Sequence, residues 1–251
     1  MKRLVQDHNH TNRIGRQEKI IRLFVYALPL LIVALSCASI ATGQQSEFEP
    51  VPGAITLPDQ IPLFPLQDVM LFPNITRPLH VFEPRYRKMV ADALEGDRII
   101  GMVLLQAGYE ADYEGNPPIL EVGCAGLIAN AEELPDGRYL IVLQGLVKFL
   151  VRSEDHSGPY RIAQVEAIPE LVDDEELSAL HQLRSSLVSI LISANGEPPP
   201  PELPDEDLVN GIAQYLAINP LERQNLLQEY GPLARAKALV ALFNDNAPKT
   251  H

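Results

Sequence analysis

The sequence contains few of the residues that several common kinds of functional site require. Its 251 residues include two cysteines, and 20 basic side chains stand against 33 acidic ones, which gives a net charge of −13. Cys37 and Cys124 cannot by themselves supply a disulfide framework or a four-ligand zinc site. The shortage of Lys and Arg weighs against nucleic acid as a partner, because binding to a phosphate backbone needs clustered basic side chains.

Common catalytic motifs are also missing. The chain has no GxxxxGK[ST] loop that would cradle the phosphates of ATP, no GxSxG turn and no HExxH helix. We therefore predict no catalytic residue and no cofactor, and we expect the protein not to be an enzyme.

The spacing of metal-binding residue types gives little support for a metal site. Side chains able to supply oxygen ligands for Ca²⁺ alternate in one acidic loop, at Glu110, Asp112, Glu114 and Asn116. The pattern does not continue to a distal bidentate glutamate, so a solvated acidic loop is the favoured interpretation. His80, His156 and His181 are scattered along the chain and are interpreted as structural or exposed, and no metal site is predicted.

The charge is distributed unevenly between the N-terminal segment and the rest. Residues 1–43 carry six basic and two acidic side chains, which leaves 14 basic and 31 acidic ones and a charge of −17 for residues 44–251. Residues 23–40 form an 18-residue run without a charge, near the minimum for crossing a bilayer core of about 30 Å. The basic flank, apolar centre and small-residue end are typical of a secretory signal with cleavage after Gly43.

Two alternatives for this segment stay open. An uncleaved membrane anchor would have the same flanks, and a lipoprotein site at Cys37 is conceivable. Each of the three leaves the basic end in the cytoplasm and places the body in the cell envelope or outside the cell. Cys124 then lacks a partner, and its small apolar neighbours favour a buried core residue.

The body has the order expected of an α+β protein. After a Pro-rich linker at 44–60, short apolar segments predict a compact β-barrel domain of about seven strands over 61–170, with one helix that begins at Pro84 and ends before Gly96. Prolines in the segment 61–66 favour an edge strand there, and 69–73 is predicted as another strand. Leu134-Pro135-Asp136-Gly137 predicts a hairpin turn.

Helix-forming residues dominate from about 171 to 245. Apolar residues at helical spacing predict a long helix after Asp173, and three shorter helices are expected near 205–217, 220–229 and 232–244. Residues 246–251 form a tail. The barrel and this helical part have the sizes of ordinary domain components.

One stretch of the barrel has a distinctive pattern. The phrase LFPLQDVMLFP at 63–73, followed by RPLHVFEPRYRKM at 77–89, resembles the N-terminal substrate-binding domain of Lon proteases. Further similarity lies in the strand at 122–125, the turn at 134–138 and the segment QGLVKF at 144–149. The sequence of these segments is most similar to that of small stand-alone bacterial proteins built from this domain.

The resemblance implies a PUA-like β-barrel followed by a helical bundle, and a role in capturing unfolded substrates or in assembly. It also draws attention to five signature residues as candidate contacts to a partner: Phe82, Glu83, Arg85, Tyr86 and Arg87. A structural role competes for these positions, with Glu83 capping the helix and the two arginines pairing with nearby acids. Lys148 stands where the family often has an arginine, and the family's Ser–Lys protease domain has no counterpart.

Three functions follow from these observations. The main hypothesis is an exported or anchored module that binds unfolded polypeptide in a groove between barrel and bundle or by β-addition at a Pro-rich edge. The alternative is an assembly adaptor that recruits a protease or an envelope partner. RNA binding through the PUA-like barrel is disfavoured by the negative charge and by export.

Overall fold

The computed structural model describes residues 55–109 and 115–246. The chain divides into two compact units. Val188–Pro199 belongs to the first, and Gly53–Leu187 together with Pro200–His251 forms the second. The second unit carries all of the contacts discussed below. Of the four residues in the predicted solvated acidic loop, Asn116 lies within the described residues, whereas those at 110, 112 and 114 lie outside them.

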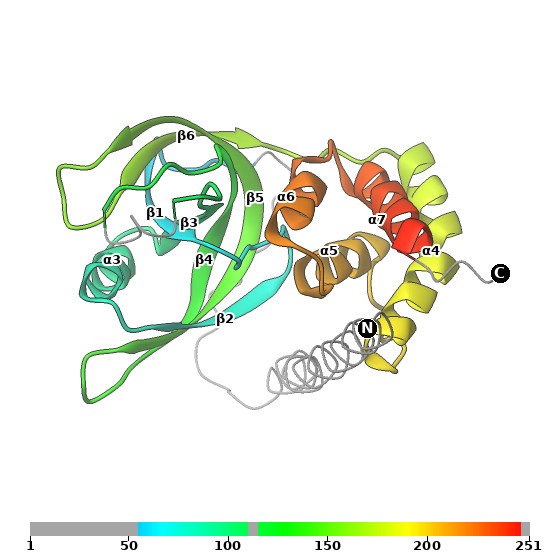
Figure 1. Ribbon diagram of the computed structural model, residues 1–251, viewed down its shortest axis with the longest axis horizontal. Coiled ribbons are helices and arrows are strands. Elements are labelled where there is room, and N and C mark those ends of the chain that lie inside the picture. Colours follow the sequence, from blue (N-terminus) through cyan, green and yellow to red (C-terminus); the bar gives the residue numbers. More distant parts are fainter. Residues whose placement is uncertain (1–54, 110–114, 247–251) are drawn as a thin grey trace, which may run out of the picture. The chain divides into compact units, whose positions relative to one another are not determined.

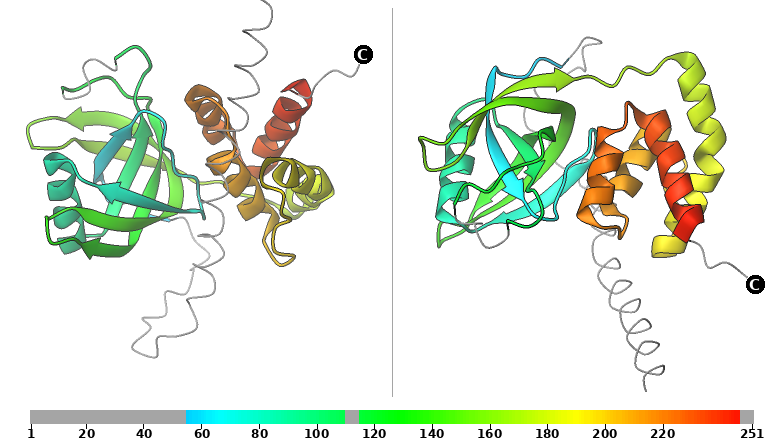
Figure 2. Two further views of the ribbon diagram at one scale, coloured as in Figure 1. Left: turned by 60° about the horizontal axis from the view of Figure 1, so that its bottom comes forward. Right: turned by 45° about the horizontal axis from the view of Figure 1, so that its top comes forward.

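A six-stranded sheet forms the β part of the molecule (Figure 1). The strands follow the order β2-β5-β4-β3-β1-β6, and β6 also pairs with β5. Because β6 contacts both β1 and β5, five strands close on themselves as a barrel and β2 is left at the edge (Figure 2). Their bounds are Gln60–Leu66 (β1), Thr76–Val81 (β2), Ile99–Leu104 (β3), Val122–Glu133 (β4), Tyr139–Asp155 (β5) and Ile162–Ile168 (β6).

The structure corrects two strand predictions. β1 is not an edge strand, since it pairs in parallel with β3 and antiparallel with β6. Its prolines are accommodated because neighbouring residues make the inter-strand hydrogen bonds. For example, the Leu63 amide donates to the Arg161 carbonyl at 2.9 Å. The segment 69–73 is not a strand, because side chains of helix α5 (Asp205–Tyr215) bind its backbone. Gln214 accepts from the Phe72 amide at 2.9 Å, and Asn210 donates to the Pro73 carbonyl at 3.0 Å.

The predicted hairpin is confirmed. β4 and β5 pair antiparallel up to Glu133 and Tyr139, and the turn between them closes with the Gly137 amide donating to the Leu134 carbonyl at 2.8 Å. Gly137 has a φ of 78°, a value that glycine adopts without steric cost. After the turn the chain forms one long strand, β5, which pairs with β2 through its first part and with β6 through its last part.

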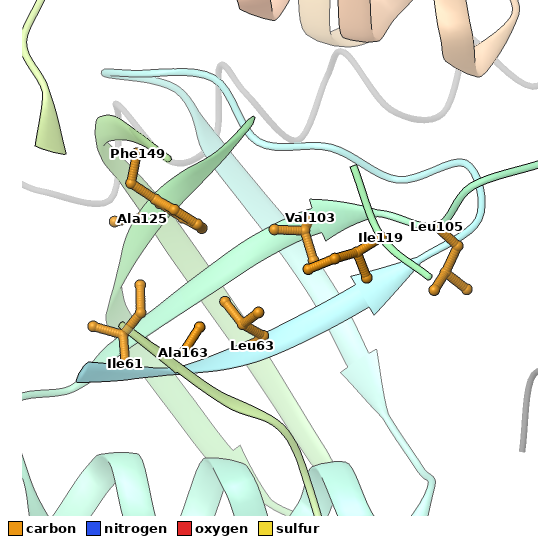
Figure 3. Packing of buried hydrophobic residues seen from close by; sticks show 8 residues of the cluster. All are labelled: Ile61, Leu63, Val103, Leu105, Ile119, Ala125, Phe149 and Ala163. Carbon is orange, nitrogen blue, oxygen red and sulfur yellow. The ribbon is translucent and has the colours of Figure 1, made fainter. Parts of the chain in front are cut away.

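Apolar side chains fill the barrel. They come from strands that lie far apart in the sequence and point toward one another in its interior (Figure 3). Burying such side chains is the main favourable contribution to folding, at about 25 cal/mol per Å² of apolar surface. The cluster consists of Ile61, Leu63, Val103, Leu105, Ile119, Ala125, Phe149 and Ala163.

Five helices complete the described part of the chain: α3 (Pro84–Glu95), α4 (Asp174–Asn195), α5 (Asp205–Tyr215), α6 (Pro220–Gln228) and α7 (Pro232–Asn246). Their starts follow the expected chemistry, because α3, α6 and α7 begin with a proline whose missing N–H is not needed there. At α6 the Asn219 side chain accepts from the Glu222 amide at 2.8 Å, and the Glu222 carboxylate accepts in return from the Asn219 amide. Helices α5, α6 and α7 contact one another.

The proposed signal or anchor at 23–40, including Cys37, lies outside the described residues. Within residues 55–109 and 115–246, no helix is long and apolar enough to cross a membrane.

Candidate functional site

The five signature residues lie where the edge strand β2 turns into α3. Phe82 follows the last residue of β2 and leaves 60% of its surface exposed. Glu83 keeps an extended backbone, with φ −68° and ψ 135°, so that Pro84 occupies the first helical position. The FEP sequence thus directs the chain out of the sheet and leaves an aromatic ring in solvent.

Glu83 does not cap α3 with its side chain, contrary to the prediction. It occupies the capping position, but no side-chain hydrogen bond caps the helix. Its carboxylate instead accepts from Nε of Arg85 at 3.0 Å, an interaction that draws it away from the helix amides. The Arg85 guanidinium also stacks on the Tyr86 ring, at 4.6 Å from its centre. The predicted pairing of Arg85 with an acid is therefore confirmed.

Tyr86 and Arg87 face different surroundings. Tyr86 is buried, and its ring centre lies 4.6 Å from that of Phe64 on β1, so this residue anchors α3 to the barrel. Arg87 donates to the backbone carbonyl of Asp136 at 3.3 Å, at the tip of the β4–β5 hairpin. Among the described residues no carboxylate comes within ion-pair distance of Arg87, so its predicted pairing with an acid is wrong.

Exposed side chains of β2 and β5 continue the surface beside Phe82. The rings of His80 and Phe82 meet edge to face with their centres 6.0 Å apart. His80 pairs with Leu140 across β2 and β5, and 42% of the Leu140 surface is exposed. We call His80, Phe82 and Leu140 the Phe82 patch. Sequence reasoning identified Phe82 but missed Leu140, because the partner of His80 depends on strand register.

α3 is fixed to the barrel at its other end. The Tyr160 hydroxyl donates to the Asp92 carboxylate at 2.7 Å, and Asp92 also pairs with Lys88 one turn earlier. Partial burial and the neighbouring Asp92 raise the pKa of Tyr160 to about 12, so the phenol remains a donor at neutral pH. The hydrogen bond to Lys88 lowers the pKa of Asp92, which keeps it ionised as an acceptor.

A buried ion-pair network connects β5 to the helices. Lys148 is 2% exposed, and its ammonium lies 2.7 Å from the Glu170 carboxylate and donates to the Glu229 carbonyl. Glu170 also pairs with Arg235 of α7, which in turn donates to the Asn210 side chain of α5. Burial lowers the pKa of Lys148, and the pairing with Glu170 opposes that shift.

The sequence singled out Lys148 but neither Glu170 nor Arg235. A buried lysine requires a carboxylate partner somewhere in the fold, but nothing in the sequence indicates which acidic residue that partner is. This network lies between the barrel and the helices, where the sequence predicted a binding groove. It holds the barrel and the helices together.

The remaining candidate residues belong neither to the Phe82 patch nor to the buried ion-pair network. Cys124 is fully buried, as predicted, and burial raises the pKa of its thiol. His156 lies 3.6 Å from Glu154, and His181 lies 2.8 Å from Asp205. In the part of the chain that the structure describes, no three His, Cys, Asp or Glu side chains gather as a metal site.

Comparisons with known proteins agree with this architecture. A family model described as the ATP-dependent protease La (LON) substrate-binding domain matches residues 60–245. Lon protease 2 of Syntrophobacter fumaroxidans is 31% identical over 180 residues, which are 68% of this chain and 22% of that protein. The Lon protease of Trichlorobacter lovleyi is 30% identical over 194 residues, or 72% of this chain and 23% of that protein. The chain thus spans about a quarter of the length of these proteases.

Two solved structures share the fold. The Lon N-terminal domain protein from Xanthomonas campestris superimposes with a TM-score of 0.53 at 24% identity, covering 72% of this chain and 97% of that one. The N-terminal domain of the Mycobacterium avium complex Lon protease gives a TM-score of 0.56 at 14% identity, covering 74% of this chain and 99% of that one. The mixed α+β fold predicted from the sequence matches these Lon N-terminal domains.

Proposed function

The chain belongs to the family of Lon substrate-binding domains, and from that membership we propose that it is a non-catalytic module that binds unfolded or extended polypeptide. The carrying observation is the Phe82 patch, an exposed apolar surface beside a strand that has one free edge. Large exposed apolar side chains that adjoin one another are typical of interaction sites.

The Phe82 patch and the edge strand β2 could together bind an extended polypeptide segment. Within the described residues β2 pairs with β5 alone, so its second edge is available for β-addition. In that mode main-chain hydrogen bonds hold the segment and an apolar pocket or patch selects its side chains. The charge of −17 on residues 44–251 favours basic unfolded segments over acidic ones.

Removing the apolar patch is expected to weaken this binding. The double variant Phe82→Ala, Leu140→Ala should bind a reduced and alkylated basic protein, such as lysozyme, at least tenfold more weakly, because burying such side chains contributes about 1.5–3 kcal/mol each. Fluorescence anisotropy with the labelled unfolded protein measures the loss.

Leu221→Ala supplies the matched control, since Leu221 is 61% exposed but lies on α6. The control should retain the affinity of the unchanged chain. Equal affinities for the double variant and the unchanged chain would show that unfolded segments bind elsewhere.

We also propose that residues 23–40 export the protein or anchor it in a membrane, with the body on the outer side. The supporting feature is the charge-free run behind a basic flank. N-terminal sequencing of the mature protein from fractionated cells is expected to give a start at Gln44 for secretion or a lipid-modified Cys37 for a lipoprotein. An intact N-terminus in the membrane fraction indicates an anchor, whereas an intact N-terminus in the cytoplasm contradicts export.

A second function, an assembly adaptor, is favoured by another observation. Tyr230, between α6 and α7, is 81% exposed, and Leu221 adds a further exposed apolar side chain on the helices. A helical surface of this kind suits one protein partner, such as a protease or an envelope protein. Recovery of one stoichiometric partner from membranes favours the adaptor, and recovery of many unfolded clients favours capture.

A further inference from the structure

Arg77 on β2 is a cation without an anionic partner. Its guanidinium lies over the Tyr215 ring of α5, at 5.0 Å from the ring centre. Among the described residues its five N–H donors meet no hydrogen-bond acceptor and no carboxylate, whereas exposed Arg152, for example, pairs with Glu166. A half-buried, stacked arginine without an acid is unexpected in a body with a charge of −17.

A second guanidinium lies close to the first. Arg223 of α6 donates to the Leu216 carbonyl at 2.8 Å and to the Asp68 carbonyl at 3.1 Å. Its Nε is buried without an acceptor, and burial together with the nearby Arg77 lowers its pKa. Arg77 and Arg223 thus contact consecutive residues, Tyr215 and Leu216, at the end of α5.

The open edge of β2 ends at the same point. The Ile75 carbonyl accepts from the Gly145 amide of β5, so alternate residues, Thr76, Pro78 and His80, turn their backbone toward the open edge, where Pro78 offers a carbonyl but no N–H. The Thr76 carbonyl is already occupied, because Tyr215 and Gln214 of α5 donate to it at 2.8 and 3.0 Å. A strand added along β2 must therefore end beside Thr76, and its other end lies toward Val81, where β2 ends.

We propose that this edge takes the C-terminal end of a polypeptide, with its terminal carboxylate at Arg77. The tail would run antiparallel to β2, since a parallel tail would place its positively charged N-terminus beside two arginines. Arg77 and Phe82 are five residues apart, about 16 Å at 3.3 Å per residue, so an apolar side chain about five residues before the C-terminus would reach the Phe82 patch. This inference rests on the proposed function and specifies its ligand.

The chemistry of the site fits a carboxylate. A guanidinium offers two parallel N–H donors to a carboxylate, and such charge-assisted pairs are about twice as strong as neutral hydrogen bonds. The Tyr215 ring fixes the Arg77 side chain before the ligand arrives, which lowers the entropy lost on binding. Arg223 adds positive potential without having to contact the ligand.

The test compares two forms of one peptide on the full-length chain. A fluorescein-labelled nonapeptide of alternating Thr and Val, with Phe five residues before its C-terminus, is prepared as the free acid and as the amide. By fluorescence anisotropy the acid should bind about tenfold more tightly than the amide. Arg77→Gln should bind both forms with the weaker affinity and lose the distinction between them.

Arg138→Gln is the matched control, because Arg138 is an exposed arginine on the neighbouring hairpin and pairs with Asp136. It should retain the tenfold preference for the acid. Equal binding of acid and amide by the unchanged chain would overturn the C-terminal site but leave polypeptide binding intact, and this comparison requires no variant. A preference that survives in Arg77→Gln would also overturn it. If the chain bound neither these peptides nor an unfolded protein, the proposed function itself would fail.

Discussion

Glu170→Gln is expected to lower the free energy of unfolding by about 3–5 kcal/mol, because it leaves two buried cations without a counter-charge. In the native protein the Glu170 carboxylate pairs with Lys148 on one side and Arg235 on the other. Neither cation can reach water, since both side chains are at most 2% exposed. Urea denaturation of the full-length chain, monitored by circular dichroism, measures the change.

Glu166→Gln is the matched control for this prediction. Glu166 pairs with Arg152 on the barrel surface, where both side chains are more than half exposed. Exposed pairs of this kind contribute about 0–1 kcal/mol, so the control should unfold close to the unchanged chain. If both variants lost a similar amount of unfolding free energy, the prediction would be wrong, because the charges of Lys148 and Arg235 would then not depend on Glu170 for stabilisation.

Gly145→Ala is expected to destabilise the protein by about 3 kcal/mol. A Cβ at Gly145 would lie 2.0 Å from the carbonyl oxygen and 2.9 Å from the carbonyl carbon of Phe72. This backbone has little freedom to move away, because the Phe72 amide is bound to Gln214 and the Phe72 side chain is buried. The thermal midpoint and the urea midpoint should both fall.

Gly211→Ala is the contrasting substitution. Gly211 lies inside α5, and a Cβ there would have Ile75 Cδ1 as its neighbour at 3.9 Å, which is ordinary contact. Alanine is the better helix former by about 0.8–1 kcal/mol, so this variant should be as stable as the unchanged chain or more so. If Gly145→Ala were equally harmless, the close approach of β5 to Phe72 would be wrong.

Local chemistry made the helices and the hairpin predictable. The prolines at 84, 220 and 232 mark helix starts, and the Asp136-Gly137 pair marks a turn, because each of these preferences acts within a few residues. The segment 69–73 shows the limit of this reasoning. Its apolar pattern is that of a strand, but Gln214 and Asn210, more than 130 residues later, take its backbone hydrogen bonds.

The candidate site was predictable in the same uneven way. The FEPRYR signature located Phe82 and the start of α3, since both depend on contiguous residues. The pairing of His80 with Leu140, the hydrogen bond of Arg87 to the Asp136 carbonyl and the stacking of Arg77 on Tyr215 could not be predicted in this way. Each depends on which strands and helices meet.

The sequence by itself determined that a β part precedes a helical part, the surplus of acidic residues, the buried character of Cys124 and membership in a family. Only the tertiary structure decided which strand is the edge. Prolines favour an edge in both β1 and β2, but barrel closure pairs β1 on both sides and leaves β2 as the edge strand of the described sheet. The physical reason is that hydrogen-bond partners in a sheet come from distant segments, so a preference read from neighbouring residues cannot choose between two strands that share it.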